Sequence, residues 1–366
     1  MTRVRAREAG VRFGDLPTGR RNMITDVPGV KVGHCTLKRG DGPLVQGVGP
    51  VRTGVTVVLP HTGNLFERPV KGAYFDLNGC GGLGGSLQIR EFGIIETPIG
   101  LTNTMSMGTV ADALVRHLLR QNPEAGLSGD TIIPIVSECD DSYLNDARGL
   151  HVHEEHVRTA LDSAGEVVDE GAVGAGTGMT CYDFKGGIGT SSRIVKAHSA
   201  EHVLGSIVLS NHGVRDELLV EGVPVGRLVD APNPRRQEHG SIVMIVGTDA
   251  PLDARQLGRI AKRAAMGLAK TGSCAHNGSG DIVLAFSTAN VHDRYNHNGL
   301  VTEHLLLDRD LDSFFRATVD SVEESIINSI FKAETTDGRD GHVSPELPIE
   351  PVVEILKARR MDQKVA

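Results

Sequence analysis

The stretch Gly240-Ser241-Ile-Val-Met-Ile-Val246 organises the C-terminal third of the chain, because an apolar run begins at a serine that glycine precedes. The run predicts a buried strand over 242–246. A helix follows over 252–270, where apolar side chains recur at helical spacing, with proline near its start and glycine past its end. A second apolar run predicts a strand over 282–286, and a third helical stripe with acidic residues on its opposite face covers 319–330. This alternation predicts an α/β fold.

The same junction suggests chemistry, because a serine hydroxyl at the start of a strand is adjacent to the carbonyl before it. Glycine permits strained or positive-φ backbone there. We expect the Ser241 hydroxyl to attack the Gly240 carbonyl and water to break the resulting ester, giving chains 1–240 and 241–366. The new α-amine, with an ordinary pKa of about 7.7–8.0, would then deprotonate the hydroxyl. The alternative is an ordinary turn before a strand.

Composition limits the classes of protein that fit. The chain has 366 residues, 39% of them hydrophobic, which is enough for a large core. A net charge of −8 without a basic cluster argues against nucleic-acid partners and anionic membrane surfaces. No apolar run approaches the roughly 20 residues of a transmembrane helix, and the first residues lack a signal-peptide core, so we expect a cytoplasmic protein. Five scattered cysteines are typical of reduced thiols.

The N-terminal two thirds carry further elements of both kinds. Apolar runs predict strands over 55–59, 132–136 and 206–209, and a helical stripe from Val110 to Leu119 ends at Asn122-Pro123. No repeat, low-complexity tract or linker marks a boundary, so we expect 1–366 to form a single domain with helix-covered sheets.

Polar side chains directly before the strand at 282–286 are candidates for the site. Ser279 and Asp281 lie in Gly278-Ser-Gly-Asp281, at the entry of that strand. A rigid strand end is able to present them to the first residue of a neighbouring strand, where they would orient Ser241 or relay its proton. A solvated turn is the alternative interpretation.

Two segments offer candidates for binding the substrate and its oxyanion. Asn211, after the strand at 206–209, and Tyr143 carry an amide and a hydroxyl that can donate to an oxyanion. Glu138, Asp140 and Asp141 concentrate negative charge beside the tyrosine. If they line a pocket, they would attract a protonated substrate amine. A turn-forming asparagine and a solvated acidic loop are the alternatives.

Three other motifs favour structural interpretations. Gly79-Cys-Gly-Gly-Leu-Gly84 fits G-x-G-x-x-G, but no suitable strand precedes it and 86–90 does not resemble a first helical turn, which disfavours a dinucleotide site. His151-Val-His-Glu-Glu-His156 misses the H-E-x-x-H spacing, so we expect a solvated helix face and no metal. Lys185-Gly-Gly-Ile-Gly-Thr-Ser-Ser192 lacks the order of a P-loop.

Taken together, the motifs resemble the DmpA-type self-processing aminopeptidases, the family of L-aminopeptidase/D-esterases and β-peptidyl aminopeptidases. The resemblance covers nearly the whole chain, and the shared order of the motifs is what makes it specific. The motifs are Asn22-Met-Ile-Thr-Asp-Val-Pro-Gly-Val-Lys-Val-Gly-His34, Ile95-Glu-Thr-Pro-Ile-Gly-Leu-Thr-Asn-Thr104, Tyr143-Leu-Asn-Asp146, Gly174-Ala-Gly-Thr-Gly-Met179, Phe184-Lys-Gly-Gly-Ile-Gly-Thr190, Glu238-His-Gly-Ser-Ile242, Asn277-Gly-Ser-Gly-Asp-Ile282 and Ala285-Phe-Ser-Thr-Ala-Asn290.

The resemblance implies an αββα four-layer sandwich, similar to N-terminal nucleophile hydrolases but with different connectivity, assembled as a homotetramer. It implies cleavage before Ser241, support from Ser279 and Asp281, and oxyanion donors at Tyr143 and Asn211. Relatives can carry glutamate at the position of Asp281. The expected activity is removal of N-terminal residues from short peptides, amides or esters without a cofactor.

Two other functions remain open from the sequence. An acyltransferase of the ornithine acetyltransferase type would pass its acyl group to an amine, but those relatives use a threonine nucleophile where this chain has Ser241. A non-enzymatic binding protein with the same fold would stay uncleaved.

Overall fold

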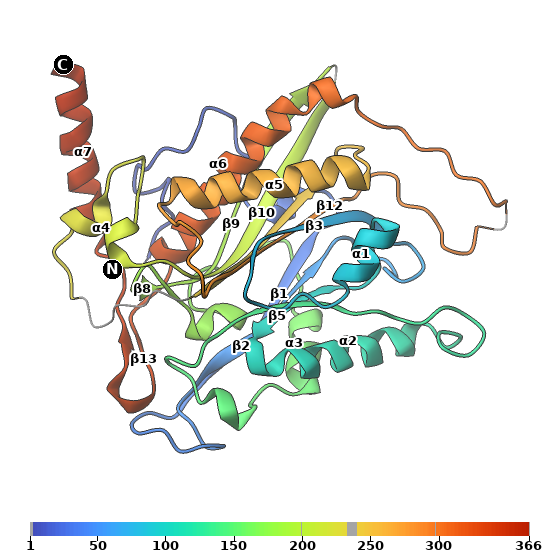
Figure 1. Ribbon diagram of the computed structural model, residues 1–366, viewed down its shortest axis with the longest axis horizontal. Helices are drawn as coiled ribbons and strands as arrows, with labels where there is room; N and C mark the ends of the chain where they lie inside the picture. Colours follow the sequence, from blue (N-terminus) through green and yellow to red (C-terminus); the bar gives the residue numbers. More distant parts are fainter. Residues whose placement is uncertain (1–2, 199, 233–239, 297, 366) are drawn as a thin grey trace.

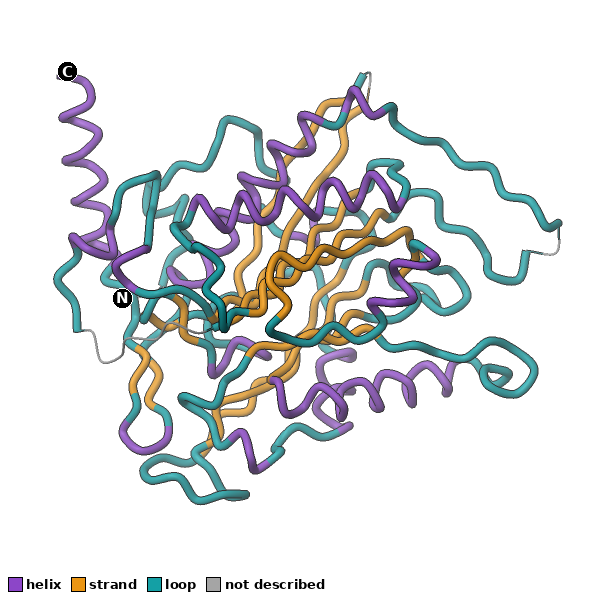
Figure 2. Tube along the Cα trace, viewed as in Figure 1, coloured by secondary structure: helices purple, strands orange, loops and turns teal. Residues whose placement is uncertain are grey.

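The chain folds into two β-sheets that pack face to face, with helices on both outer faces (Figure 1). The computed structural model describes residues 3–198, 200–232, 240–296 and 298–365. Figure 2 shows the strands gathered in the middle of the molecule, with helices above and below them.

The larger sheet has six strands and combines distant parts of the sequence. Its two central strands, β11 and β12, run parallel, and their outer neighbours pair with them in antiparallel fashion. In spatial order the strands are β4 (Ile94–Ile95), β3 (Val70–Gly79), β12 (Gly280–Ser287), β11 (Ser241–Thr248), β10 (Ala200–Asn211) and β9 (Gly187–Ala197).

The smaller main sheet has four strands, all from the first 139 residues of the chain. In order they are β1 (Lys31–Arg39), β2 (Val51–Leu59), β5 (Ile99–Asn103) and β6 (Ile135–Cys139). Two short ribbons pair β7 (Thr180–Cys181) with β8 (Phe184–Lys185) and β13 (Thr336–Asp337) with β14 (Val343–Ser344).

Two pairs of helices form the outer layers. The helices α5 (Ala254–Lys270) and α6 (Asp312–Phe331) cover the six-stranded sheet, and α2 (Met107–Gln121) and α3 (Glu154–Asp162) cover the four-stranded sheet. The remaining helices are α1 (Ser86–Phe92), α4 (Val225–Leu228) and α7 (Ile349–Val365), with 3-10 turns at Ile24–Asp26, Thr104–Ser106, Ala147–Gly149, Gly174–Gly178, Arg215–Glu217, Asp308–Asp310 and Arg339–Gly341. No helix in the described ranges is long and apolar enough to span a membrane.

Three buried apolar clusters fill the spaces between these four layers. One joins α5 and α6 to the large sheet, through residues such as Ile260 and Met244. A second lies between the sheets and includes Leu101 and Ile245. A third joins α2 and α3 to the small sheet, through residues such as Leu114 and Val57. This arrangement confirms the expected αββα sandwich.

The predicted order of elements after residue 240 is confirmed, because β11, α5, β12 and α6 follow one another. The start of α5 is capped by Asp253, whose side chain accepts from the backbone N–H of Gln256. Past its end, Gly272 has a φ of +105°, which a side chain would disfavour. The strand expected at 132–136 begins later, at Ile135.

Three local expectations were wrong in whole or in part. The segment after the glycine-rich turn does form a helix, α1, and the strand β3 precedes that turn. The solvated helix face expected over 151–156 is only partly present: α3 begins at the exposed Glu154, but His151 precedes the helix and is buried, with its Nε2 2.9 Å from Asp146 Oδ2. Asp320, Glu323 and Glu324 of α6 are buried rather than on a solvated face: Glu324 pairs with Arg193 at 2.7 Å, and both of these side chains are fully buried.

Candidate functional site

The parallel pairing of β11 and β12 brings the predicted residues together. Since the starts of parallel strands meet at one edge of a sheet, Ser241 lies directly beside Gly280. The backbone N–H of Gly280 donates to Ser241 Oγ at 3.2 Å. On the other side of β11, the antiparallel strand β10 ends at Asn211, directly opposite Ser241. Both neighbours of the serine are therefore set by sheet register.

Ser279 and Asp281 form a buried pair at the start of β12. Ser279 Oγ donates to Asp281 Oδ1 at 2.8 Å. Burial raises the pKa of Asp281 to about 6, while the hydrogen bond from Ser279 and the nearby His276 oppose this shift. A carboxyl group with a pKa this close to neutrality is able to exchange protons under physiological conditions.

Gly240 is required by a close approach rather than by an unusual φ. Its φ lies outside the left-handed range, so the positive-φ conformation considered for this glycine is not present. A Cβ at this position would lie 2.0 Å from the carbonyl oxygen of Asn211 and 2.8 Å from His212 Cα. Both atoms are backbone atoms, so any side chain would force the start of β11 away from β10. His239 and Glu238, the two residues before it, lie outside the described residues.

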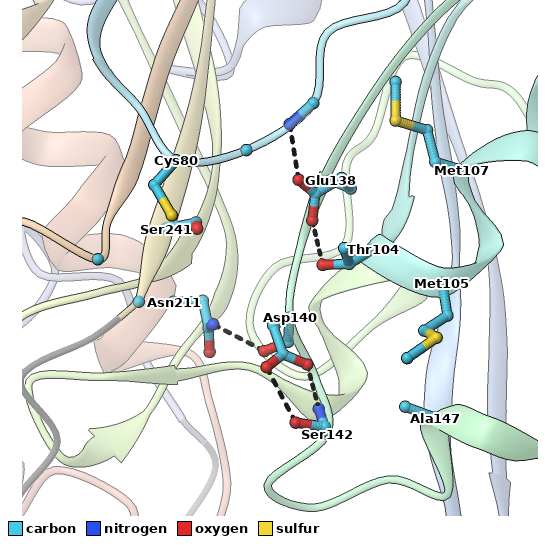
Figure 3. A pocket seen from close by; sticks show the side chains of 14 residues that line it. Cys80, Thr104, Met105, Met107, Glu138, Asp140, Ser142, Ala147, Asn211 and Ser241 are labelled. Carbon is cyan, nitrogen blue, oxygen red and sulfur yellow. Dashed lines mark hydrogen bonds between the residues drawn. The ribbon is translucent and has the colours of Figure 1, made fainter.

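A pocket of about 630 Å³ opens above this strand edge (Figure 3). Its volume is typical of small-molecule sites. Fourteen residues line it: Cys80, Gly81, Gly82, Thr104, Met105, Met107, Glu138, Asp140, Ser142, Ala147, Asn211, Gly240, Ser241 and Gly278. The large sheet contributes Ser241 and Asn211, and the small sheet contributes Glu138, so the pocket lies where the edges of the two sheets meet.

Glu138 gives one wall of the pocket a fixed negative charge. It is buried, and its Oε1 accepts from the backbone N–H of Gly82 at 2.8 Å. Its Oε2 accepts from the Thr104 hydroxyl, and Figure 3 shows both contacts. A carboxylate held in place by two donors is suited to binding a substrate ammonium group.

The other acidic residues of the segment lie in different surroundings. Asp140 lines the pocket, and its carboxylate accepts from the backbone N–H and the hydroxyl of Ser142. Asp141 is buried outside the pocket lining, where its Oδ1 accepts from Asn145 Nδ2 at 2.9 Å and burial raises its pKa to about 7. Of the predicted amine-binding residues, Glu138 and Asp140 are therefore brought together.

The two predicted oxyanion donors are not equally placed. Asn211 lines the pocket, with its Oδ1 accepting from Thr180 N and its Nδ2 donating to Asp140 O, both at 2.8 Å. These contacts hold the amide, which has a second N–H. Tyr143 is not among the lining residues. Its ring stacks on His342 with centroids 4.5 Å apart, and its hydroxyl lies 3.5 Å from Val343 O.

The sequence analysis missed part of the pocket. Cys80, Gly81 and Gly82 belong to the glycine-rich turn between β3 and α1, which the sequence motif alone does not identify as part of the site. Met105 and Met107 form an apolar wall at the start of α2. The useful signal was the run of small residues after Gly79, because such a turn allows a ligand close to the backbone. Lys185, in the glycine-rich segment 185–192 that lacks the order of a P-loop, is buried in β8. Its ammonium group donates to three backbone carbonyls.

Comparisons with known proteins agree with this architecture. Residues 22–344 match the model of peptidase family S58. The β-peptidyl aminopeptidase BapA of Sphingosinicella microcystinivorans is 39% identical over 372 aligned positions, covering 97% of this chain and 92% of the relative.

Two solved structures have the same fold over nearly their whole length. A Pyrococcus horikoshii protein matches with a TM-score of 0.94 and 49% identity, over 97% of this chain and 99% of that one. An L-aminopeptidase D-Ala-esterase/amidase of Ochrobactrum anthropi, described as a variant of the Ntn hydrolase fold, matches with a TM-score of 0.91 and 36% identity, over 97% and 98% of the two chains. The resemblance seen in the sequence motifs is confirmed, and the chain belongs to peptidase family S58.

Proposed function

We propose that this protein is a self-processing aminopeptidase with an N-terminal serine nucleophile. It removes N-terminal residues from short peptides, amides or esters through an acyl-enzyme. The observation that carries the proposal is that Ser241, its strand neighbour Asn211 and a buried carboxylate, Glu138, line one pocket. The names of the relatives, a β-peptidyl aminopeptidase and an L-aminopeptidase D-Ala-esterase/amidase, agree with this class of substrate.

Self-cleavage begins at the peptide bond between Gly240 and Ser241. Ser241 Oγ forms a bond to the Gly240 carbonyl carbon, and the C–N bond breaks as the hydroxyl proton passes to the nitrogen. Water then hydrolyses the ester, which releases the Gly240 carboxylate and restores the hydroxyl. The products are 1–240 and 241–366, two chains of one domain. The N–H of Gly280, 3.2 Å from Oγ, orients the hydroxyl for this step.

Peptide hydrolysis then uses the new α-amine of Ser241 as the nearest base. Its ordinary pKa of about 7.7–8.0 suits proton transfer near neutral pH. The buried pair of Ser279 and Asp281 positions the nucleophile and the amine. Asn211 donates to the tetrahedral oxyanion, and water finally breaks the acyl-enzyme. Tyr143 stays a proposed second donor, although it lies outside the pocket lining.

Substrate selection follows from the negative charge on the pocket wall formed by Glu138 and Asp140. Glu138 and Asp140 attract the free amine of the substrate, and Glu138 is the fixed contact within the pocket. Asp141, the third residue proposed for this role, is buried outside the pocket lining. A requirement for a free amine limits the enzyme to chain ends, so exopeptidase action is expected. No cofactor is needed in this scheme. We further propose that the enzyme is a homotetramer located in the cytoplasm.

Intact-mass analysis of purified enzyme, with denaturing electrophoresis, tests the first step. We expect two fragments whose masses correspond to 1–240 and 241–366, and a single full-length chain from Ser241→Ala. The two samples are then compared on p-nitroanilides of L-, D- and β-amino acids, on which only the cleaved enzyme should act. A cleaved Ser241→Ala variant, or activity from an intact wild-type chain, would contradict the mechanism.

The same preparations separate the other functions. Adding an amine acceptor and analysing the products distinguishes hydrolysis from acyl transfer, since a transferase would yield mainly the acylated acceptor. One uncleaved band near 39 kDa with no activity on the whole substrate panel would identify a binding protein instead.

A further inference from the structure

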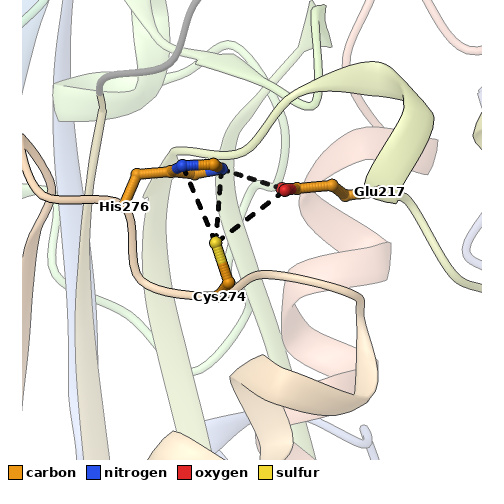
Figure 4. A group of neighbouring side chains, drawn as sticks. All are labelled: Glu217, Cys274 and His276. Atoms are coloured by element: carbon orange, nitrogen blue, oxygen red, sulfur yellow. Dashed lines mark hydrogen bonds and ion pairs between the residues drawn. The ribbon is translucent and has the colours of Figure 1, made fainter.

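Three potential metal ligands meet outside the pocket lining, close to the turn that carries Ser279. Glu217 ends the 3-10 helix Arg215–Glu217, and Cys274 and His276 lie between α5 and β12 (Figure 4). Their ligand atoms all lie within 4.8 Å of one another. His276 Nε2 is 3.0 Å from Glu217 Oε2, and Cys274 Sγ is 3.6 Å from His276 Nε2 and 3.8 Å from Glu217 Oε1.

These separations match the dimensions of a tetrahedral zinc site. Zinc lies about 2.3 Å from thiolate sulfur and about 2.0–2.2 Å from imidazole nitrogen or carboxylate oxygen. At the tetrahedral angle, two such ligand atoms are about 3.3–3.6 Å apart. The distance of 3.6 Å between His276 Nε2 and Cys274 Sγ already has this length. One oxygen of Glu217 contacts the nitrogen and the other contacts the sulfur, so rotation of the carboxylate would bring one oxygen to the same ion. Sulfur, nitrogen and carboxylate oxygen are also the donors that zinc uses in proteins.

A nucleophilic Cys–His–Glu triad fits the geometry less well. In a triad, one ring nitrogen faces the sulfur and the other faces the carboxylate. Here Cys274 Sγ is almost equidistant from the two nitrogens of His276, at 3.7 and 3.6 Å, so neither lone pair is aimed along the line to the sulfur. His276 Nε2, which contacts the carboxylate, is as close to the thiol as Nδ1 is, so the two contacts are not divided between the two nitrogens.

We propose that Glu217, Cys274 and His276 bind one Zn²⁺ ion, with water as its fourth ligand. The side chains of Glu217 and His276 are each about one quarter exposed and Cys274 is exposed, so the ion has a path from solvent. This site is separate from the proposed nucleophile and does not depend on self-cleavage.

The ion would join two segments that are far apart in the sequence. The carbonyl of His276 accepts from the backbone N–H of Ser279 at 2.7 Å and from Asn78 Nδ2 at 2.8 Å. A metal ligand at His276 therefore fixes the turn that leads to Ser279 and ties it to the helix at Arg215–Glu217. The expected role of the ion is to stabilise the turn before β12, so that bound metal raises the melting temperature.

Cobalt titration of the untagged full chain tests the proposal directly. Co²⁺ replaces Zn²⁺ in such sites, and bound thiolate gives a charge-transfer band in the near ultraviolet. We expect one equivalent of Co²⁺ with this band, its displacement by Zn²⁺, and a higher melting temperature with Zn²⁺. Cys274→Ser should abolish the band and weaken binding at least about tenfold. Cys80→Ser, the change at the other exposed cysteine, should retain both.

Two further variants give the proposal clear ways to fail. Glu217→Gln should weaken binding while retaining the thiolate band, because sulfur remains a ligand. Ser241→Ala should bind Co²⁺ as the wild type does, even though it loses cleavage and activity, which separates this proposal from the proposed function. Equal binding in the wild type and Cys274→Ser, or no band at a saturating excess of Co²⁺, would overturn it.

Discussion

Ser279 donates a 2.8 Å hydrogen bond to one oxygen of Asp281, and the other oxygen, Oδ2, is buried with no hydrogen-bond partner among the described residues. The carboxylate is thus oriented by one neighbour while keeping a lone pair for a proton. We expect Asp281→Asn to slow self-cleavage and to lower kcat by about 10²-fold, because the nucleophile and the amine would no longer be held in place. Initial rates on an L-amino acid p-nitroanilide check this, and a variant with wild-type kcat would remove Asp281 from the mechanism.

The same carboxyl group makes stability depend on pH. Because burial raises the pKa of Asp281 to about 6, its favourable contribution is fully present below about pH 4 and is lost as pH rises through about 6. Between pH 4 and pH 7, Ser241→Ala should therefore lose stability relative to Ser241→Ala/Asp281→Asn. Melting temperatures of both uncleaved proteins, measured from pH 4 to pH 7 with a chelator present, show which of the two loses stability. Parallel curves would show that Asp281 titrates normally.

Asn211 offers a second kinetic test, because its amide is held beside Ser241 by two backbone contacts. Asn211→Ala should lower kcat by about 10²–10³-fold with little change in KM, the pattern for a donor that acts mainly on the oxyanion. Asn122→Ala is the matched control, since that buried amide bonds to Asn64 instead. A similar loss of kcat in the control would point to general loosening of the fold.

Glu138 should control KM more than kcat. Glu138→Gln keeps a carbonyl oxygen for Gly82 N–H and a polar partner for Thr104 but removes the charge. We expect KM for amine-bearing substrates to rise about tenfold or more, since a charge-assisted contact contributes about 1.5–3 kcal/mol. Asp140→Asn, at the more exposed neighbour, should have the smaller effect. An unchanged KM in the first variant would place the substrate amine elsewhere.

The buried ion pair of Arg193 and Glu324 should matter for stability. Both side chains are fully buried, so Arg193→Met leaves a buried carboxylate whose one ionic partner among the described residues is Arg7. The free energy of unfolding should fall by about 3–5 kcal/mol. Arg116→Met, at an exposed pair with Asp112, should change it by less than about 1 kcal/mol. Urea denaturation in the Ser241→Ala background measures both, and equal effects would contradict the role of burial.

Local patterns in the sequence predicted the central unit of the fold well. The apolar runs at 242–246 and 282–286 flank a well-capped helix, and a strand–helix–strand order predicts parallel neighbours. That pairing is why Ser241, Ser279 and Asp281 were grouped correctly at one end of two strands. The roles assigned to them stay predictions.

The parts of the fold and of the site that the sequence did not predict depend on contacts between distant segments. The strand β3, with its Lys, Asn and Asp, has no clear apolar period, and it joins the sheet through its pairing with β12. Asp141 and Tyr143 follow a strand end, where the chain turns, so no simple alternation indicates which side chains face the pocket. The structure places Asp140 there and Asp141 in the interior.

The strand order of the large sheet has a further consequence for a nicked molecule. Every strand that 241–366 adds to this sheet is held between β10 and β3, which belong to 1–240. Separating 241–366 from 1–240 would break the backbone hydrogen bonds between β11 and β10 and between β12 and β3. It would also expose the apolar layers on both faces of the sheet. Cleavage of the single peptide bond before Ser241 would thus create a new N-terminus while both fragments stay held in one fold.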